Sequence, residues 1–338
     1  MRKISGILAA SALLAGIVFV APAAYASETI TGTGSTYMNP FQQGCRAIYT
    51  KNSVDYTGTG SSTGLSNFKR GATNFGGTDN AYTAGDEPRE KFTYVPLVGG
   101  PIVVAYNVPG LKSLRLTPAN ISDIFNGVIT KWNDAALKKT NPTAKLPDNN
   151  IQIVYRSDGS GTTNNFANYL KQTVPGSKWT ANNTYATALG KSAIGIGASG
   201  NSLTTAEVAK TPYSITYADP ADAKKNKLSL AAVQNASGEF VKPSIATAAR
   251  FISAQTVAAN GLVAFDYNKK VKGAYAPTLL AYGLAPTASD RPEKAAAVKD
   301  YFTFLIKTCG PQRAAANDYV ALTGAIQATA LKLIATIK

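Results

Sequence analysis

The sequence of 338 residues contains no histidine, only two cysteines and only 19 acidic side chains. Without histidine, a Ser-His-Asp triad, a histidine-ligated metal site and histidine-dependent phosphoryl transfer are excluded. Ser62 in GSSTG occupies the nucleophile position of a G-x-S-x-G elbow, but it has no histidine to activate it. No acidic cluster has the spacing of a two-metal phosphatase, and the pattern G-x-x-x-x-G-K-[ST] is absent. We therefore expect a protein that binds a ligand without catalysis, with no metal and no cofactor.

The shortage of acidic residues leaves a formal net charge of +15. A positive surface raises the local concentration of anions, so this balance favours an anionic ligand or partner. The lysines are scattered through KKTNPTAK, AKKNK and NKKVKG, without a recognition motif or interleaved aromatic residues. This distribution does not indicate nucleic-acid binding, and it also suits lysines that simply keep the surface soluble.

Residues 1–26 have the features of a cleaved secretory signal. Arg2 and Lys3 provide a positive start, an apolar stretch spans residues 7–20, and the small-residue sequence AYA ends the segment. The apolar stretch is shorter than the roughly 20 residues of a membrane-spanning helix, which disfavours the alternative of an uncleaved anchor. No cysteine follows it, so a lipid anchor would have no attachment atom. We expect a periplasmic or secreted protein that starts at Ser27.

The two cysteines, Cys45 and Cys309, agree with export because oxidising compartments favour disulfide formation. The alternative, two buried free thiols, stays open from the residues alone. If the two residues pair, the N-terminal and C-terminal parts of the chain must be neighbours in space.

Segments typical of β-strands alternate with amphipathic segments along the chain. The strand-like segments are rich in β-branched and aromatic residues, and they are ETITG, SVDYTG, NFGGTD, YVPLVGGPIVVAYNV and IQIVYRSD. The helical segments between them are NPFQQGCRAIYTK, TGLSNFKRG, TPANISDIFNG and TTNNFANYLKQ, and the C-terminal part is also helical. This order predicts an α/β protein with mostly parallel sheets, and the length suffices for two domains.

Three loops between a predicted strand and a predicted helix combine glycine with hydroxyl residues: TGTGSTY at 31–37, GTGSSTG at 58–64 and YRSDGSGTTNNF at 155–166. Such loops direct several backbone N–H groups, and the positive end of the helix dipole, toward one point. The hydroxyl groups that could add donors belong to Thr36, Ser61, Ser160 and Thr162, and Arg156 could add a bidentate fork. Each loop alone could simply cap its helix. Together the loops predict a cage for a small tetraoxyanion.

Motifs along most of the chain resemble the phosphate-binding proteins of bacterial high-affinity phosphate ABC transporters. They are TGTGSTY, GTGSSTG, FGGTDN, VGGPIVVAYNVPGLK, DIFNGVITKWND, LPDNNIQIVYRSDGSGTT and FTFLIKTCG. The resemblance implies a two-lobed periplasmic binding protein of type II, in which each lobe has a mixed, mostly parallel sheet flanked by helices and the ligand binds in the cleft. It places lobe I at 27–107 plus 275–338 and lobe II at 108–274, with Cys45 and Cys309 in the same lobe.

The resemblance also implies a set of phosphate ligands. These are Thr36, the backbone of Tyr37, Ser61, Asp79, Arg156, Ser160, Gly161 and Thr162. Asp158 matches the aspartate that pairs with the site arginine and orients its guanidinium. Asp79 is informative because a carboxylate accepts hydrogen bonds but repels a second anion, so it suits an anion site only if the ligand carries a proton of its own. Phosphate carries such a proton at neutral pH and sulfate does not, so we expect sulfate to be rejected.

The expected function is extracytoplasmic binding of inorganic phosphate, with arsenate as a competitor, and delivery by a monomer to the permease of an ABC importer. A secreted phosphate scavenger that works without a transporter is one alternative, and a secreted phosphomonoesterase is another. The resemblance loosens after residue 190: Ser202 stands where many relatives have an acidic residue, and TPYSITYAD replaces a strand that usually contains G-x-I-G-Y. These departures concern the outer wall of the cleft and remove no expected ligand.

Overall fold

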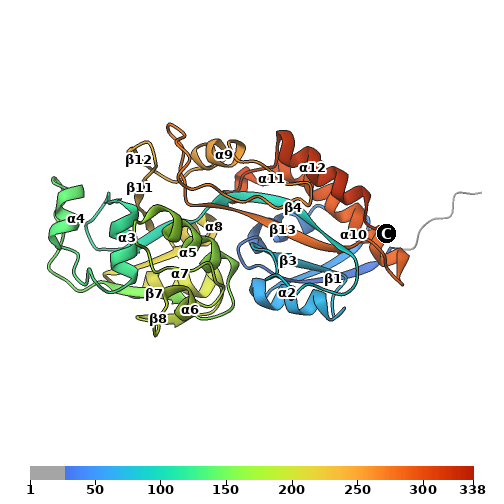
Figure 1. Cartoon of the computed structure of the whole chain (residues 1–338), viewed down its shortest axis with the longest axis horizontal. Coiled ribbons are helices and arrows are strands. Elements are labelled where there is room, and N and C mark those ends of the chain that lie inside the picture. The colour runs from blue at the N-terminus through green and yellow to red at the C-terminus, as the bar shows by residue number, and fades with distance from the viewer. Residues whose placement is uncertain (1–26) are drawn as a thin grey trace, which may run out of the picture.

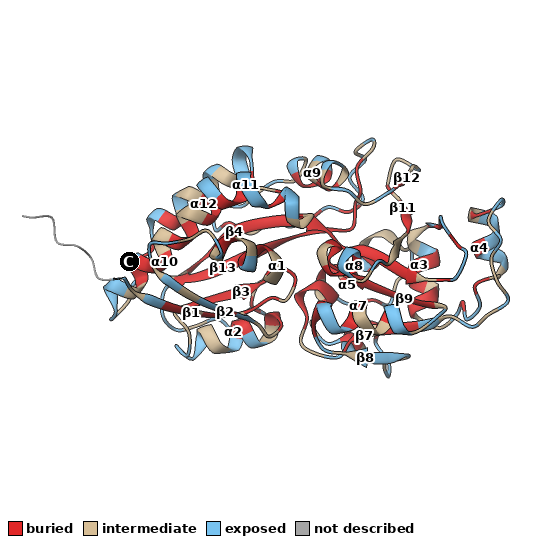
Figure 2. Cartoon of the chain, turned by 180° about the vertical axis from the view of Figure 1, so that it is seen from behind, coloured by how far each residue is buried: buried red, intermediate tan, exposed pale blue. Residues whose placement is uncertain are grey.

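The computed structural model describes residues 27–338, and the expected signal at 1–26 lies outside this range. The described chain forms two lobes side by side, each built around a five-stranded sheet (Figure 1). Buried residues follow the strands of both sheets, while exposed residues lie mainly on the outer faces of the helices (Figure 2). Among residues 27–338, no helix combines the length and apolar character required to cross a bilayer.

The sheet of the first lobe is assembled from both ends of the chain. Its strands, in spatial order, are β2 (Ser53–Gly58), β1 (Thr29–Gly34), β3 (Phe75–Thr78), β13 (Thr278–Pro286) and β4 (Phe92–Pro101). β1 runs parallel to β2 and β3, with Ile30 opposite Val54, whereas β13 runs antiparallel to β3 and β4. Since β13 lies between β3 and β4, the first lobe is complete only after the chain has returned from the second lobe.

Helices from both ends of the chain cover this sheet. They are α1 (Asn39–Arg46), α2 (Ser61–Lys69), α10 (Pro292–Phe304), a π-helical turn (Leu305–Cys309), α11 (Gly310–Arg313), a 3-10 turn (Ala315–Asn317) and α12 (Gly324–Ala335). Aromatic side chains from the two ends of the chain pack together in the core. The Phe75 ring of β3 stacks on Tyr56, with 5.9 Å between ring centroids, and packs edge-on against Phe302 of α10, with 5.5 Å between centroids. Such packed aromatic residues supply a large share of the apolar burial.

The sheet of the second lobe has the same size. Its strands, in spatial order, are β10 (Ser229–Leu230), β5 (Val103–Asn107), β9 (Ser214–Ala218), β7 (Gln152–Arg156) and β8 (Ile196–Ala198). The helices around it are α3 (Pro118–Phe125), α4 (Ala135–Thr140), α5 (Gly161–Thr173), α6 (Tyr185–Leu189), α7 (Gly200–Lys210) and α8 (Pro220–Lys225). A small sheet of β12 (Phe240–Val241), β11 (Ala232–Gln234) and β6 (Arg115–Leu116) adjoins it, followed by α9 (Ile245–Ser253).

Local sequence explains where the helices of this lobe begin. Thr117 and Asn120 form a reciprocal capping box at the start of α3, with a proline in the first turn, and Ser160 caps α5. The inner faces carry large rings, and Phe166 of α5 stacks on Tyr217 of β9 with 4.3 Å between ring centroids. The fold is thus an α/β arrangement with mixed sheets, as the sequence predicts.

The sheets differ from the expectation in one respect: parallel pairing accounts for half of each large sheet rather than most of it. In the first sheet the antiparallel pairs all involve β13, and in the second they all involve β5. These are the strands next to the two passages between lobes. Each of these strands runs antiparallel to both of its neighbours. The direction of a strand in its sheet depends on the path of the chain between the lobes, and local strand and helix signals do not reveal that path.

The two passages between the lobes lie beside each other. Ile102, between β4 and β5, donates its backbone N–H to Pro277 O at 2.7 Å, and Tyr275 donates its hydroxyl to Ile102 O at 2.9 Å. β5 pairs within the second sheet, although the sequence expectation assigned residues up to 107 to lobe I. The difference arises because one apolar run, YVPLVGGPIVVAYNV, supplies a strand to each sheet.

The segment that contains α9 packs on the first lobe, and its end also contacts α5 of the second lobe, where Gln172 bonds the backbone of Phe265 and Tyr267. α9 lies against β4 and β13 (Figure 1). A Cβ atom on Gly99 of β4 would lie 2.9 Å from the side chain of Ile252, and Val263 donates its backbone N–H to the Tyr282 hydroxyl at 3.1 Å. We propose lobe boundaries at Ile102 and Tyr275, with residues 245–267 grouped with lobe I instead of with lobe II.

The two cysteines form a disulfide, which confirms the pairing that was left open by the residues alone. Cys45 lies in α1 and Cys309 ends the π-helical turn, with 5.6 Å between their Cα atoms and 264 positions between them in the sequence. Both side chains are fully buried. The bond ties the last helices of the chain to the first helix within the first lobe.

Reduction of this disulfide should destabilise the protein by about 2–5 kcal/mol, because a bond that closes a long loop restricts the unfolded chain. We expect a lower melting temperature in the presence of reductant and no free thiols in the oxidised protein under denaturing conditions. The double variant Cys45→Ser with Cys309→Ser should melt at the reduced temperature with or without reductant. An unchanged melting temperature on reduction would contradict a structural role for the bond.

Candidate anion-binding site

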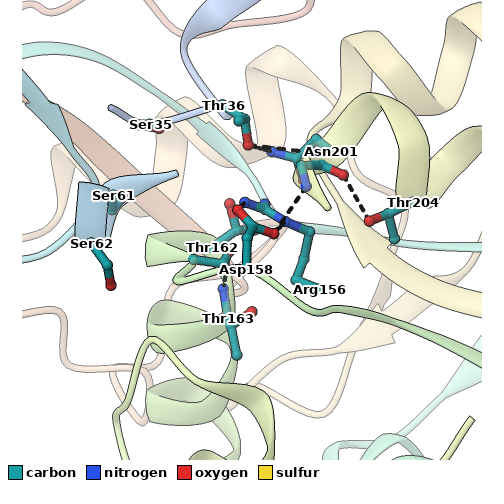
Figure 3. A network of polar contacts seen from close by, with 12 residues as sticks. Ser35, Thr36, Ser61, Ser62, Arg156, Asp158, Thr162, Thr163, Asn201 and Thr204 are labelled. Atoms are coloured by element: carbon teal, nitrogen blue, oxygen red, sulfur yellow. Dashed lines mark hydrogen bonds and ion pairs between the residues drawn. The ribbon is translucent and has the colours of Figure 1, made fainter. Parts of the chain in front are cut away.

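The three predicted loops meet between the lobes. The first follows β1, the second joins β2 to α2, and the third joins β7 to α5. Figure 3 shows Thr36 and Ser61 from the first lobe facing Arg156 and Thr162 from the second. The loops touch directly, since Ser62 donates its backbone N–H to Gly159 O at 3.1 Å. The structure therefore has the lobes closed upon each other.

The buried ion pair between Arg156 and Asp158 is the electrostatic centre of the site. Arg156 Nε and Nη2 donate to the two carboxylate oxygens of Asp158 at 2.7 and 2.6 Å, and the arginine side chain is only 1% exposed. Although burial opposes ionisation, the hydrogen bonds and charge of Arg156 lower the pKa of Asp158. Within residues 27–338, Arg156 Nη1 is buried and has no hydrogen-bond partner. One part of the guanidinium is therefore neutralised, and another is left to bind an anion.

Asp79 brings a second buried carboxylate to the same place, directly after β3. Its side chain accepts a hydrogen bond from the Ser35 hydroxyl at Oδ1 and one from Thr162 at Oδ2, the latter at 3.4 Å. Burial raises the pKa of Asp79 to about 6, against the opposing effects of Ser35 and Arg156. Asp79 is consequently ionised above about pH 6 and becomes a hydrogen-bond donor below it.

The third loop presents donors from the start of α5. Ser160 accepts a hydrogen bond from Thr163 N at 3.1 Å, so its own hydroxyl hydrogen is free to point into the site. Gly161 and Thr162 occupy the first two helical positions, whose N–H groups have no acceptor within the helix. The loop thus caps its own helix and offers donors at the same time, so the two interpretations of the sequence are compatible.

The second loop contributes Ser61 at the start of α2. Its oxygen accepts a hydrogen bond from Asp79 N at 3.1 Å, which leaves its hydrogen available. Ser61 is buried, and the neighbouring Ser62 accepts a hydrogen bond from the Asn183 side chain at 3.0 Å. Ser62, the elbow position, is therefore engaged in lobe-to-lobe contact.

In the first loop, both Thr36 and the backbone N–H of Tyr37 take part in hydrogen bonds within the protein. The Thr36 hydroxyl oxygen accepts hydrogen bonds from Asn201 Nδ2 at 3.2 Å and from Asn201 N at 3.4 Å. Its hydrogen must then point elsewhere. Tyr37, expected to offer its backbone N–H to the anion, donates it to Ser35 Oγ at 3.1 Å, and its ring is buried with the hydroxyl bonded to Pro101 O.

Two participants, Ser35 and Asn201, were missed by the sequence analysis. Ser35 lies within the recognised motif, but nothing in the sequence distinguishes it from a turn residue. Asn201 is fully buried at the start of α7, in the stretch GASGNS, where a strand again passes through Gly and Ser into a helix. Its backbone neighbour Gly200 donates to Asp158 Oδ1 at 2.9 Å. This fourth strand-to-helix loop was the available signal.

Glycine permits the close approach of the lobes. A Cβ atom on Gly159 would lie 2.4 Å from Ser62 Cβ, and one on Gly161 would lie 2.4 Å from Ser61 Oγ. A polar cavity of about 920 Å³ opens beside these contacts, between the segments around Tyr82 and Asn183. No cluster of acidic or cysteine side chains within residues 27–338 could hold a metal ion.

Two lobes joined by two neighbouring passages, with a polar site closed between them, define a periplasmic-binding-protein fold. The chain matches the PBP superfamily domain over residues 20–308. It is 34% identical to the phosphate-binding protein PstS of Pasteurella multocida, over 88% of this chain and 87% of that protein. It is 32% identical to the phosphate-binding protein PstS 3 of Mycobacterium tuberculosis, over 86% of this chain and 81% of that protein. The chain therefore belongs to the PstS family of phosphate-binding proteins.

Solved structures agree with this fold. A high-affinity periplasmic phosphate-binding protein, PfluDING, bound with phosphate, superposes with a TM-score of 0.73 at 20% identity, over 89% of this chain and 92% of that chain. A phosphate-binding protein from Stenotrophomonas maltophilia superposes with a TM-score of 0.69 at 19% identity, over 90% and 93%. The recognition of the family and the two-lobed fold predicted from the motifs are confirmed.

The Gly159→Ala substitution should hinder closure of the lobes without disturbing either lobe. Gly159 has no positive φ, so alanine fits its backbone, but the added methyl would overlap Ser62 across the cleft. Overpacking of this kind costs about 1–3 kcal/mol, so the closed population should fall roughly 5- to 150-fold relative to the open one. Fluorophores on the two lobes, or small-angle scattering, measure the change.

The matched control is the double variant Gly159→Ala with Ser62→Gly, which removes the obstructing Cβ atom. Closure should return in the double variant if the methyl acts by contact between lobes. Failure of the second change to restore closure, with an unchanged melting temperature, would mean that Gly159 acts through its own loop.

Proposed function

We propose that this protein binds inorganic phosphate between its lobes outside the cytoplasm and delivers it to the permease of an ABC importer. The proposal is carried by two neighbouring groups in one buried site: Arg156 Nη1, which has no hydrogen-bond partner among the described residues, and Asp79, whose pKa burial raises. A cation with a spare donor attracts an anion. A buried carboxylate beside it requires that the anion carry a proton.

The proposed ligand set combines groups that remain free after the internal hydrogen bonds are made with the Tyr37 N–H and the Thr162 hydroxyl, which would exchange Ser35 and Asp79 for the ligand. Donors come from the hydroxyl groups of Thr36, Ser61, Ser160 and Thr162, the N–H groups of Tyr37, Gly161 and Thr162, and Arg156 Nη1, and the acceptor is Asp79. Asp158 acts through Arg156 by holding its guanidinium in place. A tetrahedral anion would exchange its hydration shell for hydrogen bonds from these donors. The charge-assisted bond from Arg156 would be the strongest of these hydrogen bonds.

Discrimination between phosphate and sulfate would depend on Asp79. Above about pH 6 its carboxylate is ionised and accepts a hydrogen bond from a protonated oxygen of phosphate. Sulfate has no proton at this pH, so a sulfate oxygen and a carboxylate oxygen of Asp79, both acceptors, would face each other in the buried site. An unsatisfied buried group of this kind costs about 1–3 kcal/mol, and more when it is charged.

Transport fits the chain better than catalysis. The similar proteins are named phosphate-binding proteins, and Ser62 has no histidine base anywhere in the sequence. A scavenger that works without a transporter would use the same site and remains the second candidate. Action as a monomer and periplasmic or secreted placement belong to the same proposal.

Purified protein should bind phosphate with a dissociation constant of roughly 1 μM or tighter, equivalent to about 8 kcal/mol. Arsenate should compete because it has the same shape and similar protonation, whereas sulfate should fail at pH 8. Isothermal titration calorimetry measures all three. Sulfate binding as tight as phosphate binding at pH 8 would refute the role of Asp79, and the absence of phosphate binding would refute the function.

Arg156→Ala should weaken phosphate binding at least about tenfold, since a hydrogen bond to a charged group contributes about 1.5–3 kcal/mol. The variant also leaves Asp158 buried without its partner, so its melting temperature must be measured. Arg115→Ala, an exposed arginine over the Phe240 ring in the same lobe, is the matched control and should bind normally. Equal phosphate affinities in the two variants would remove Arg156 from the site.

A further inference from the structure

Ser35 is a fully buried residue whose single hydroxyl hydrogen has a defined destination. Its oxygen accepts hydrogen bonds from Tyr37 N at 3.1 Å and Met38 N at 3.4 Å. With both N–H groups directed at its lone pairs, the hydroxyl hydrogen points away from them and is donated to Asp79 Oδ1. A serine that only stabilised the turn would need to accept the backbone N–H groups, and it would not need to donate to Asp79.

The contact makes the two oxygens of Asp79 unequal. Oδ1 accepts the hydrogen bond from Ser35 of the same lobe, whereas Oδ2, in the part of the chain that the structure describes, receives only the 3.4 Å contact from Thr162 of the opposite lobe. The remainder of Asp79 is held as well, because its backbone N–H donates to Ser61 and its carbonyl accepts from Asn165 at 2.6 Å. Ser35 therefore determines which carboxylate oxygen stays available in the site.

We propose that Ser35 is a positioning residue that determines anion specificity: it turns Oδ2 of Asp79 toward the protonated oxygen of the ligand and keeps the carboxylate ionised, so that anions without a proton are rejected. The proposal rests on the proposed function of phosphate binding. It adds a residue outside the expected ligand set and assigns it an effect on selectivity and on the pH dependence of binding.

The charges around Asp79 support this role. Burial raises its pKa, and the hydrogen bond from Ser35 is the largest opposing influence, ahead of the charge of Arg156. The other titratable groups that face Asp79 are Tyr37, Tyr56 and Tyr282, and burial raises the pKa of each phenol, so all three stay neutral. Arg156 is the cation of the site. Asp79 is thus the group in this set that changes charge between pH 5 and pH 8.

The direction of the effect follows from the sign of the Ser35 contribution. A hydroxyl that donates to a carboxylate favours the ionised form and lowers the pKa, so its loss raises the pKa of Asp79 further. A protonated Asp79 donates a hydrogen bond, and sulfate can accept it. Loss of the Ser35 hydroxyl should therefore admit sulfate at a higher pH, while phosphate, which can donate or accept, should be affected less.

The test is calorimetric titration of the full chain with phosphate and with sulfate from pH 5 to pH 8.5, for the native protein, Ser35→Ala and Ser214→Ala. Ser214 is a matched control: it is also a fully buried serine, and its hydroxyl donates to Val208 O and Thr211 O in the second lobe. In Ser35→Ala, the rise of sulfate affinity with falling pH should begin at higher pH. The ratio of phosphate to sulfate affinity near pH 7 should fall at least about tenfold, the effect of one hydrogen bond to a charged group.

A second arm links the effect to Asp79. Asp79→Asn replaces the titrating group by an amide, so its sulfate binding should not follow pH, and adding Ser35→Ala should no longer shift the profile. If Ser35→Ala fails to fold, Ser35→Cys keeps the size of the side chain with a weaker donor and should shift the profile in the same direction.

The outcomes separate the two proposals. Equal weakening of both anions by Ser35→Ala at every pH, with an unmoved profile, would overturn the specificity role and leave Ser35 as a turn residue. A profile shift that persists in the Asp79→Asn background would also overturn it. Failure of the native protein to bind phosphate would instead overturn the proposed function.

Discussion

The site depends on one incompletely satisfied buried charge. Arg156 lies at the end of β7, where its guanidinium is out of water, and Asp158, two residues later, compensates it through two hydrogen bonds. A buried cation without such a partner would be strongly destabilising, whereas complete compensation would leave nothing for an anion. The remaining Nη1 keeps an affinity for negative charge inside the closed cleft. The glycines around it let the opposite lobe approach closely enough to enclose that charge.

Around this charge, hydroxyl groups act both as hydrogen-bond acceptors and as donors. Ser160 and Ser61 each accept an internal backbone N–H, and Thr36 accepts from Asn201, so each hydrogen is left for the site. Ser35 reverses the pattern by giving its hydrogen to Asp79. Hydroxyl side chains can therefore supply donors to the ligand and also hold its acceptor, since Ser35 donates to Oδ1 and Thr162 to Oδ2 of Asp79. Since the contacts join both lobes, the complete set exists only when the lobes are closed.

Local patterns were sufficient for much of the architecture. The change from β-branched residues to a Gly-Ser turn and then to helical spacing correctly located β1, β2 and β7 and the helix that follows each of them, because turn and capping geometry involves residues a few positions apart. The strand β5 was assigned to the other lobe because it continues an apolar run without interruption. The packing of α9 on β4 likewise has no local signature, since any amphipathic helix presents an apolar face.

The sequence by itself determined the absence of histidine chemistry, the family motifs and the three loops, because each is a matter of composition or of short spacing, and the family resemblance implied the pairing of Arg156 with Asp158. Only the tertiary structure decided that Cys45 meets Cys309 and that Ser35 binds Asp79, 44 positions away. It alone joined Asn201 to Thr36, which are 165 positions apart. Hydrogen bonds act over about 3 Å, so partners distant in the sequence are selected by how sheets and helices pack, and no local pattern of residues records that choice.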